Sequence, residues 1–225
     1  MAEENAKTTK REIIAAGGKS EAISCDVTNE TEVDTAVARF VAACGSPRIL
    51  VNGAAADDPS GTILELTPAW WAKVLAVNLT GAYLMSRAVL PHMIAAGGGS
   101  IIHIASQMGR VGAAGRPAYC ATKGALIQLA KVMAADHAAQ NIRVNVLCPG
   151  SFSSELFDKY LAAGRGPKIL AAHPMGRIAE PEEVAGLIVL SADNPDLRTR
   201  TREGRTEVLM ATMTTVLKGF VIPLF

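Results

Sequence analysis

The 225-residue sequence predicts a single α/β domain, doubly wound around a mostly parallel sheet. Short apolar runs alternate with longer amphipathic stretches, which is the pattern of strand–helix–strand units. The short runs are apolar on both sides of the strand alternation, as in strands that helices cover on both faces. We expect the domain to span residues 1–196, followed by an atypical tail over residues 197–225.

The predicted elements alternate in the order that βαβ units require. The predicted strands are Ala22–Cys25, Arg48–Asn52, Ser100–Ala105 and Arg143–Cys148. The predicted helices are Glu4–Ala16, Glu30–Cys44, Thr67 to about Ala96, Pro117–Ala139 and Glu182–Ala192. After about Asp196 the pattern degrades, and Glu207–Met210 is a candidate last strand within a Thr/Met-rich tail.

Several helix ends carry local signals. Gly17-Gly18 ends the first helix, and Asn29 precedes the second with Glu32 at capping-box spacing. Thr67-Pro68 combines an N-cap residue with proline at the first helical position. Pro181 starts the last predicted helix in the same way. These signals fix where the helices begin, and the apolar runs between them fix the strands.

Composition excludes several classes of protein. A formal net charge of +1 gives no electrostatic reason to expect nucleic acid or an anionic membrane as partner. The arginines after Leu197 lack interleaved aromatic residues, so we interpret them as a solvated loop. The apolar stretch Ala82–Ala96 is broken by Arg87, Pro91 and His92, and the first residues, Met1 to Asn5, contain no apolar h-region. We therefore expect a cytoplasmic protein with no membrane or nucleic-acid partner.

Cysteine and histidine spacing indicates neither disulfides nor a metal site. The 4 cysteines lie far apart with no C-x-x-C pair, which is typical of reduced cytosolic thiols. The 4 histidines share no metal-ligand spacing. His103 lies inside the apolar run Ile101–Ala105, so we expect a hydrogen-bonded structural histidine there.

Three residues form a candidate acid–base centre. Ser106 follows a buried strand at its carboxyl end, where open α/β sheets bind ligands. Tyr119 and Lys123 are four residues apart on a predicted helix and so share a face. A lysine ammonium lowers the pKa of a nearby tyrosine from about 10 by about 1–3 units. Alone the Y-x-x-x-K spacing is weak, because most such pairs are a surface tyrosine with a snorkelling lysine.

The surrounding motifs strengthen this interpretation. They are Cys25–Thr28, Ile49–Ala55, Val77–Gly81, the set Ser106, Tyr119 and Lys123, Arg143–Asn145 with Pro149-Gly150, and Gly176-Arg177 with Pro181–Ala185. With these motifs in this order, the chain resembles the short-chain dehydrogenase/reductase family from about Gly17 to about Asp193. The resemblance implies a Rossmann-type sheet. It also implies hydride transfer between a secondary alcohol and a ketone with NAD or NADP, without indicating which of the two cofactors.

The resemblance also implies roles for individual residues. Tyr119 would be the acid–base residue, and Lys123 would lower its pKa and hold the nicotinamide ribose. Ser106 would polarise the substrate carbonyl, and Asn78 would support a water relay to Lys123. The cofactor-binding positions implied are Asp26 and Val27 at the adenine, Asn52, Gly53 and Ala54 at the adenosine ribose, and Pro149, Gly150 and Phe152 at the nicotinamide. Gly115-Arg116 and Phe152–Tyr160 should line the substrate pocket. Family members form dimers or tetramers, so a homodimer or homotetramer is expected.

Each position also has a simpler interpretation. Asn78 can satisfy backbone groups beside a long helix, and Asp26-Val27 can be only a strand exit leading to the Asn29 cap. Pro149-Gly150 is an ordinary turn signal. For each position taken singly, the simpler interpretation is favoured. When all positions are taken together with the spacing of Ser106 and Tyr119, the functional interpretation is favoured.

The sequence departs from the family at three places. The glycine-rich loop T-G-x-x-x-G-x-G and its flanking strands and helix are absent, and Gly109, Gly112 and Gly115 have the wrong spacing to replace the loop. The N-N-A-G motif has become Asn52–Ala55, and the D-G-G segment has no match in residues 207–216. We therefore expect an N-terminally incomplete domain with weak cofactor binding and exposed strand edges. A truncated gene model or an incorrect start codon would explain the N-terminal loss, and a frame error near Arg198 would explain the tail. The alternative is a catalytically silent subunit or a truncated fragment, which acts, if at all, through oligomer association.

Overall fold

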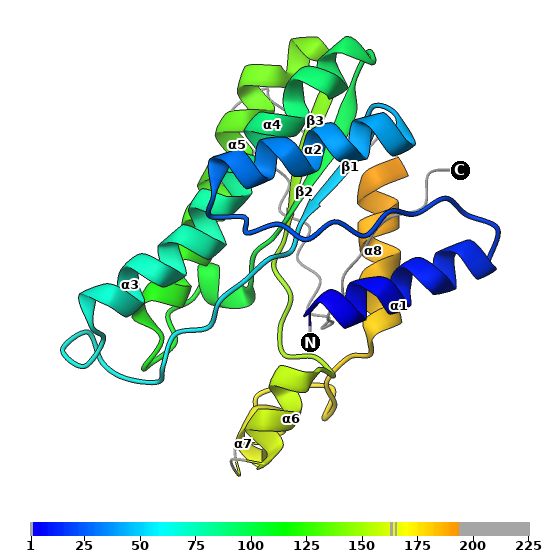
Figure 1. The fold of residues 1–225 in the computed structure, drawn as a ribbon. Helices are drawn as coiled ribbons and strands as arrows, with labels where there is room; N and C mark the ends of the chain where they lie inside the picture. Colours follow the sequence, from blue (N-terminus) through cyan, green and yellow to red (C-terminus); the bar gives the residue numbers. More distant parts are fainter. Residues whose placement is uncertain (1, 163, 165, 194–225) are drawn as a thin grey trace.

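The computed structural model describes residues 2–162, 164 and 166–193 (Figure 1). Three parallel strands form its sheet in the order β1-β2-β3, and they are Ile49–Asn52, Gly99–Ile104 and Ile142–Leu147. Consecutive strands are neighbours and are joined by helical segments, as in βαβ units. Asn52, His103 and Val146 are aligned across the sheet. The predicted α/β fold with a parallel sheet is confirmed.

Helices cover both faces of this sheet (Figure 1). The helices are α1 (Ala2–Ala15), α2 (Glu30–Cys44), α3 (Pro68–Leu75), α4 (Gly81–Ala95), α5 (Pro117–His137), α6 (Glu155–Ala162), α7 (Gly166–Ala171) and α8 (Pro181–Asp193). On one face, α2, α4 and α5 enclose the larger apolar cluster, which includes Met93, Ile101 and Val144. On the other face, Val184 and Ile188 of α8 pack on Ile102 and Leu147. The strands are therefore buried from both sides, which explains their unbroken apolar character.

The N-terminal signals of two helices behave as expected. The side chain of Asn29 caps α2 by accepting from the Glu32 N–H at 3.3 Å. The Glu32 carboxylate accepts from the N–H of Asp26 at 2.9 Å, and so ties the preceding turn to the helix. Thr67 caps α3 by accepting from the Trp70 N–H at 3.3 Å, with Pro68 at the first helical position.

The predicted strand at Ala22–Cys25 is wrong. Residues 18–26 contain no strand, and the segment crosses the molecule as an irregular connection between α1 and α2. Within the described residues β1 pairs with β2 alone, so no neighbouring strand offers Ala22–Cys25 a ladder of backbone hydrogen bonds. An ion pair between Lys10 and Glu21 at 2.7 Å ties the segment back to α1.

The long predicted helix from Thr67 to Ala96 is interrupted in its middle. A single π-helical turn over Ala76–Thr80 separates α3 from α4 and carries Asn78. Single π-helical turns are rare in proteins, and those that occur are often found at functional sites. By length and composition the combined span Pro68–Ala95 could cross a membrane, and its buried residues pack against α2, the sheet and α5.

Two short helices between β3 and α8, α6 and α7, are absent from the predicted element list. They lie together below the carboxyl edge of the sheet in Figure 1. The candidate strand Glu207–Met210 and the tail from residue 197 lie outside the described residues.

Candidate active site

A cavity of about 330 Å³ lies at the carboxyl ends of the strands. The residues that line it are Gly53, Ala55, Ala56, Asp57, Ile104, Ala105, Ser106, Tyr119, Lys123, Pro149, Gly150, Phe152 and Val184. The loops after all three strands and the first turns of α5 therefore converge there. This is the edge at which open parallel sheets bind ligands.

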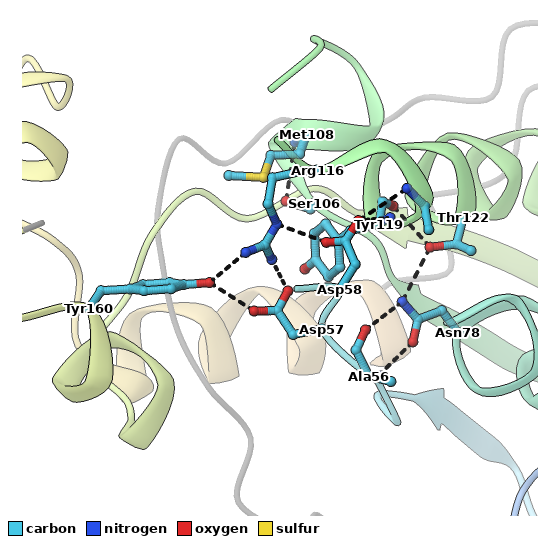
Figure 2. Close-up of polar contacts among 11 residues, drawn as sticks. Ala56, Asp57, Asp58, Asn78, Ser106, Met108, Arg116, Tyr119, Thr122 and Tyr160 are labelled. Atoms are coloured by element: carbon cyan, nitrogen blue, oxygen red, sulfur yellow. Dashed lines mark hydrogen bonds and ion pairs between the residues drawn. The ribbon is translucent and has the colours of Figure 1, made fainter. Parts of the chain in front are cut away.

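Ser106 and Tyr119 lie together in this cavity (Figure 2). Ser106 leaves the end of β2, and its Oγ accepts from the N–H of Met108 at 3.1 Å. Burial raises the pKa of Tyr119, while a hydrogen bond with the Ser106 side chain and the charge of Arg116 act to lower it. Two hydroxyl groups thus meet at the carboxyl end of β2.

Lys123 is almost completely buried behind Tyr119, at 2% exposure. Its ammonium donates to the carbonyl of Ile104 at 2.6 Å and lies 5.5 Å from the centroid of the Tyr119 ring. Burial lowers the pKa of Lys123 to about 8. Arg116, with its guanidinium carbon 5.2 Å from the same centroid, is the cation that lowers the pKa of Tyr119 in this geometry. The expected effect of Lys123 on that pKa stays a prediction.

The close approach of the turn after Ser106 to α5 requires a glycine at position 109. A Cβ atom at this position would lie 2.6 Å from the backbone carbonyl carbon and oxygen of Lys123. The turn after Ser106 can approach α5 this closely only without a side chain. Gly109 therefore serves close packing, which agrees with the rejection of the Gly109, Gly112 and Gly115 series as a phosphate cradle.

Asn78 fixes the loop after β1 and does not line the cavity. Its Oδ1 accepts from the N–H of Ala56 at 2.6 Å, and its Nδ2 donates to the Ala56 carbonyl at 3.0 Å. The same Nδ2 lies 3.2 Å from Oγ1 of Thr122 on α5 (Figure 2). The interpretation that Asn78 satisfies backbone groups describes its contacts, and the proposed water relay stays a prediction.

The implied cofactor positions divide into two groups. Gly53, Pro149, Gly150 and Phe152 line the cavity with the acid–base residues. The structure does not bring the other four, Asp26, Val27, Asn52 and Ala54, to the cavity lining.

The contacts of three of these four residues are structural. The carboxylate of Asp26 accepts from the N–H and hydroxyl of Thr28, at 2.9 and 2.8 Å. Val27 packs so closely on Gly81 that a Cβ there would lie 2.7 Å from its Cγ2. The Nδ2 of Asn52 points into the core, 3.0 Å from Ser86 Oγ and 3.2 Å from His103 Nδ1.

Sequence reasoning missed a cluster of charges beside Tyr119. Arg116 is ion-paired with Asp57 and with Asp58, and its Nη1 lies 3.1 Å from the hydroxyl of Tyr160 on α6 (Figure 2). The Tyr160 hydroxyl donates in turn to Asp57 at 3.0 Å. Arg116 and Tyr160 belong to the segments expected near the substrate. The signal for Asp57 and Asp58 was that two adjacent carboxylates stand in the loop that follows β1.

Comparison with known proteins decides the family. The family model described as enoyl-(acyl carrier protein) reductase matches residues 1–194. A Burkholderia xenovorans protein assigned to the short-chain dehydrogenases/reductases superposes with a TM-score of 0.75 at 38% identity, over 82% of this chain and 71% of that one. The chain belongs to the short-chain dehydrogenase/reductase family.

Other members of the short-chain dehydrogenase/reductase family are similar over most of their length. Cis-4-hydroxycyclohexanecarboxylate dehydrogenase of Sinomonas cyclohexanicum is 36% identical over 191 residues, 85% of this chain and 76% of its own. The gluconate 5-dehydrogenase of Burkholderia cenocepacia J2315, solved in complex with NADP and tartrate, has a TM-score of 0.79 at 33% identity, over 84% of this chain and 74% of its own. "Inactive 2-(S)-hydroxypropyl-CoM dehydrogenase 2" of Xanthobacter autotrophicus is 36% identical over 174 residues, 75% of each chain. The Rossmann-type fold expected from the sequence is thereby confirmed.

Proposed function

We propose that this family member is an oxidoreductase that interconverts a secondary alcohol and a ketone with NAD or NADP. The observation that carries the proposal is the meeting of Ser106, Tyr119 and Lys123 in one cavity at the carboxyl edge of a parallel sheet. Dehydrogenase names among the relatives support the same class of reaction. The description of the matching family model is one activity within the family and is not carried over to this chain.

The chemistry of the cavity follows from its hydroxyl groups. In the reductive direction, the Tyr119 hydroxyl donates a proton to the ketone oxygen, and Ser106 donates a hydrogen bond that holds this oxygen in place. In the oxidative direction, Tyr119 accepts the proton of the alcohol. The Ser106 hydrogen bond and the Arg116 charge oppose the rise that burial causes in the Tyr119 pKa, and so bring the phenol closer to the range of acid–base catalysis.

The nicotinamide end of a cofactor fits the residues of the cavity. Among the described residues, the Ile104 carbonyl is the acceptor that the structure gives to the buried Lys123 ammonium, which leaves donors for the hydroxyl groups of a ribose. Pro149, Gly150 and Phe152 form the wall on which the nicotinamide ring would lie. When bound, the cofactor supplies or accepts the hydride.

The pyrophosphate end has a poorer fit. Pyrophosphate binding in this fold relies on backbone N–H groups of a glycine-rich loop at a helix N-terminus. The 225 residues contain no such motif. Gly109 packs against the backbone of Lys123 and so serves another purpose than phosphate binding. We therefore propose that this chain by itself binds NAD or NADP weakly.

We also propose a substrate class, a cellular location and an oligomeric state for the protein. The substrate is a small molecule, and the protein acts in the cytoplasm as a homodimer or homotetramer, without a nucleic-acid or membrane partner. Side chains on the outer faces of α4 and α5, such as Tyr83 and Val132, are 47% and 57% exposed and support association through these helices.

A catalytically silent subunit is the second candidate. Two observations favour it: the sequence lacks a glycine-rich loop, and a relative 36% identical to this chain is named an inactive dehydrogenase. Such a subunit would keep the fold and the helical faces but would act only through association.

Titration with cofactor separates the two candidates. We expect purified protein to bind NADH or NADPH saturably, with a dissociation constant above the micromolar range. Each missing charge-assisted backbone contact costs about 1.5–3 kcal/mol. At millimolar cofactor, a panel of secondary alcohols and ketones should show turnover that Tyr119→Phe lowers by about a hundredfold or more. Absence of saturable binding and of turnover would establish the silent subunit.

A further inference from the structure

We infer that Asp58 is a positioning residue for Tyr119, because its carboxylate binds the backbone of Tyr119 and the arginine that lies over the Tyr119 ring. This inference rests on the proposed role of Tyr119 as the acid–base residue. Asp58 itself does not line the cavity.

The first contact is a cap on α5 supplied from a distant part of the chain. The Asp58 Oδ2 atom accepts from the N–H groups of Ala118 and Tyr119, each at 3.1 Å. The first N–H groups of a helix have no partner within the helix, and a negative charge is stabilised there. The residue at the N-cap position, Arg116, makes no capping bond with its side chain. Asp58 thus replaces the local cap, and does so at the amide of Tyr119.

The second contact fixes the cation beside the ring. Asp58 Oδ1 lies 2.9 Å from Nε of Arg116, and the side chain of Asp58 has no exposed surface. Arg116 reaches Asp57 and Tyr160 with its other nitrogens, and its guanidinium carbon lies 5.2 Å from the Tyr119 ring centroid. One buried carboxylate therefore binds both the backbone of Tyr119 and the arginine beside its ring (Figure 2).

The loop after β1, which carries Asp58, is itself held in place by Asn78. Two residues earlier, Ala56 is held at its N–H and its carbonyl by Asn78, at 2.6 and 3.0 Å. Asn78 also contacts Thr122, one turn beyond Tyr119 on α5. The loop after β1 is therefore attached to α5 at the amide of Tyr119 and, through Asn78, one turn further along the helix, so the position of Tyr119 depends on this loop.

The test compares Asp58→Ala, Asp58→Asn and the control Thr67→Ala by amide hydrogen exchange followed with NMR. Thr67→Ala also removes a helix cap, at α3, outside the cavity. In Asp58→Ala, exchange at the Tyr119 amide should quicken by about tenfold or more relative to Thr67→Ala, as expected for the loss of a hydrogen bond to a charged acceptor. In Asp58→Asn the remaining amide oxygen should keep exchange within about threefold of wild type.

Kinetics supply the second readout. In the proposed reaction, Asp58→Ala should lower kcat with little change in the dissociation constant for NADH, and Asp58→Asn should recover most of kcat. Equal exchange at Tyr119 in Asp58→Ala and Thr67→Ala, or equal defects in the Asn and Ala variants, overturns the inference. If Asp58→Ala does not fold, Asp58→Ser, whose hydroxyl lies one bond nearer the backbone, takes its place. Wild-type protein without turnover would refute the proposed function, while the exchange data would still decide the role of Asp58.

Discussion

Two buried polar clusters occupy the same end of strand β2, and they differ in charge. In the core cluster, Asn52 Nδ2 donates to Ser86 Oγ and to Nδ1 of His103, and burial lowers the pKa of His103 to about 4. The site cluster consists of Ser106, Tyr119 and Lys123. Lys123 is as deeply buried as His103, yet its pKa falls only to about 8, and its ammonium donates to the Ile104 carbonyl. At neutral pH the core cluster is therefore neutral, and the site cluster keeps a buried charge.

The difference indicates what each cluster is for. A buried neutral group with a hydrogen-bond partner costs little stability, whereas a buried ammonium without a counter-ion costs several kcal/mol. Such a cost is typical of residues whose role is functional rather than structural. The comparison predicts that changes in the core cluster alter stability alone, that changes in the site cluster lower activity, and that removal of the Lys123 charge raises stability at the same time.

Tyr119→Phe should have the largest effect. The change removes one hydroxyl from the site cluster, so turnover should fall by about 10²–10⁴, the contribution of general acid–base catalysis. Folding and cofactor affinity should stay close to those of wild type, which circular dichroism and titration with NADH can check. Near-normal turnover in the variant would remove Tyr119 from the mechanism.

The site and the fold were predictable from the sequence to different degrees. Local signals suffice for strands β1–β3 and for the caps Asn29 and Thr67, whereas Ser106, Tyr119 and Lys123 were grouped by the order of motifs that the chain shares with a family. The predicted strand at Ala22–Cys25 failed because a strand depends on a neighbouring backbone, which its own apolar residues cannot supply. Helices α6 and α7 were missed because each is less than nine residues long. Asp58 was missed because the N–H groups that it accepts from lie 60 and 61 residues further along the chain.

His103 should make the core cluster sensitive to acid. Its pKa is near 6.5 when unfolded and about 4 when folded, so the unfolded chain binds more protons between these values. The free energy of unfolding should therefore fall by about 3 kcal/mol as the pH drops from 6.5 to 4. Glu183, with its pKa lowered to about 2 by Arg177 and near 4.5 when unfolded, overlaps only the acid end of this window.

Urea unfolding at several pH values tests the His103 prediction. In His103→Asn the slope over this pH window should be flatter by about the same 3 kcal/mol, because the titrating ring is gone. Cofactor affinity and turnover of the variant at pH 7 should match wild type. An unchanged slope would assign the acid sensitivity to other groups.

Lys123→Met should stabilise the protein and inactivate it. Because the pKa of Lys123 is about 8 when folded and near 10.5 when unfolded, the unfolded state of wild type binds more protons between these values. Wild type should thus gain stability as the pH rises from 8 to 10.5. At pH 7 the variant should be more stable by about 2 kcal/mol, after subtraction of about 1 kcal/mol for the hydrogen bond lost at Ile104.

The measurement for Lys123→Met is the free energy of unfolding at pH 7 and above pH 10, together with turnover and the KM for cofactor. Turnover should fall and the KM for cofactor should rise, because the ammonium is proposed to hold the ribose. Lys168→Met, at an exposed position on α7, is the matched control and should change none of these values. A variant that is less stable than wild type at pH 7 would show that the buried ammonium is adequately compensated.

Ser86→Ala should have the smallest effect and is the sharpest test that the core cluster is only structural. The Ser86 hydroxyl lies 3.0 Å from Nδ2 of Asn52 and donates to the Ala82 carbonyl at 2.7 Å. Asn52 keeps His103 as a partner in the variant, so no buried donor loses its last acceptor, and the cost should be about 1 kcal/mol. Turnover and cofactor affinity should not change. A loss of cofactor affinity in Ser86→Ala would mean that the orientation of Asn52 matters to the bound cofactor, and the two clusters would then act as one.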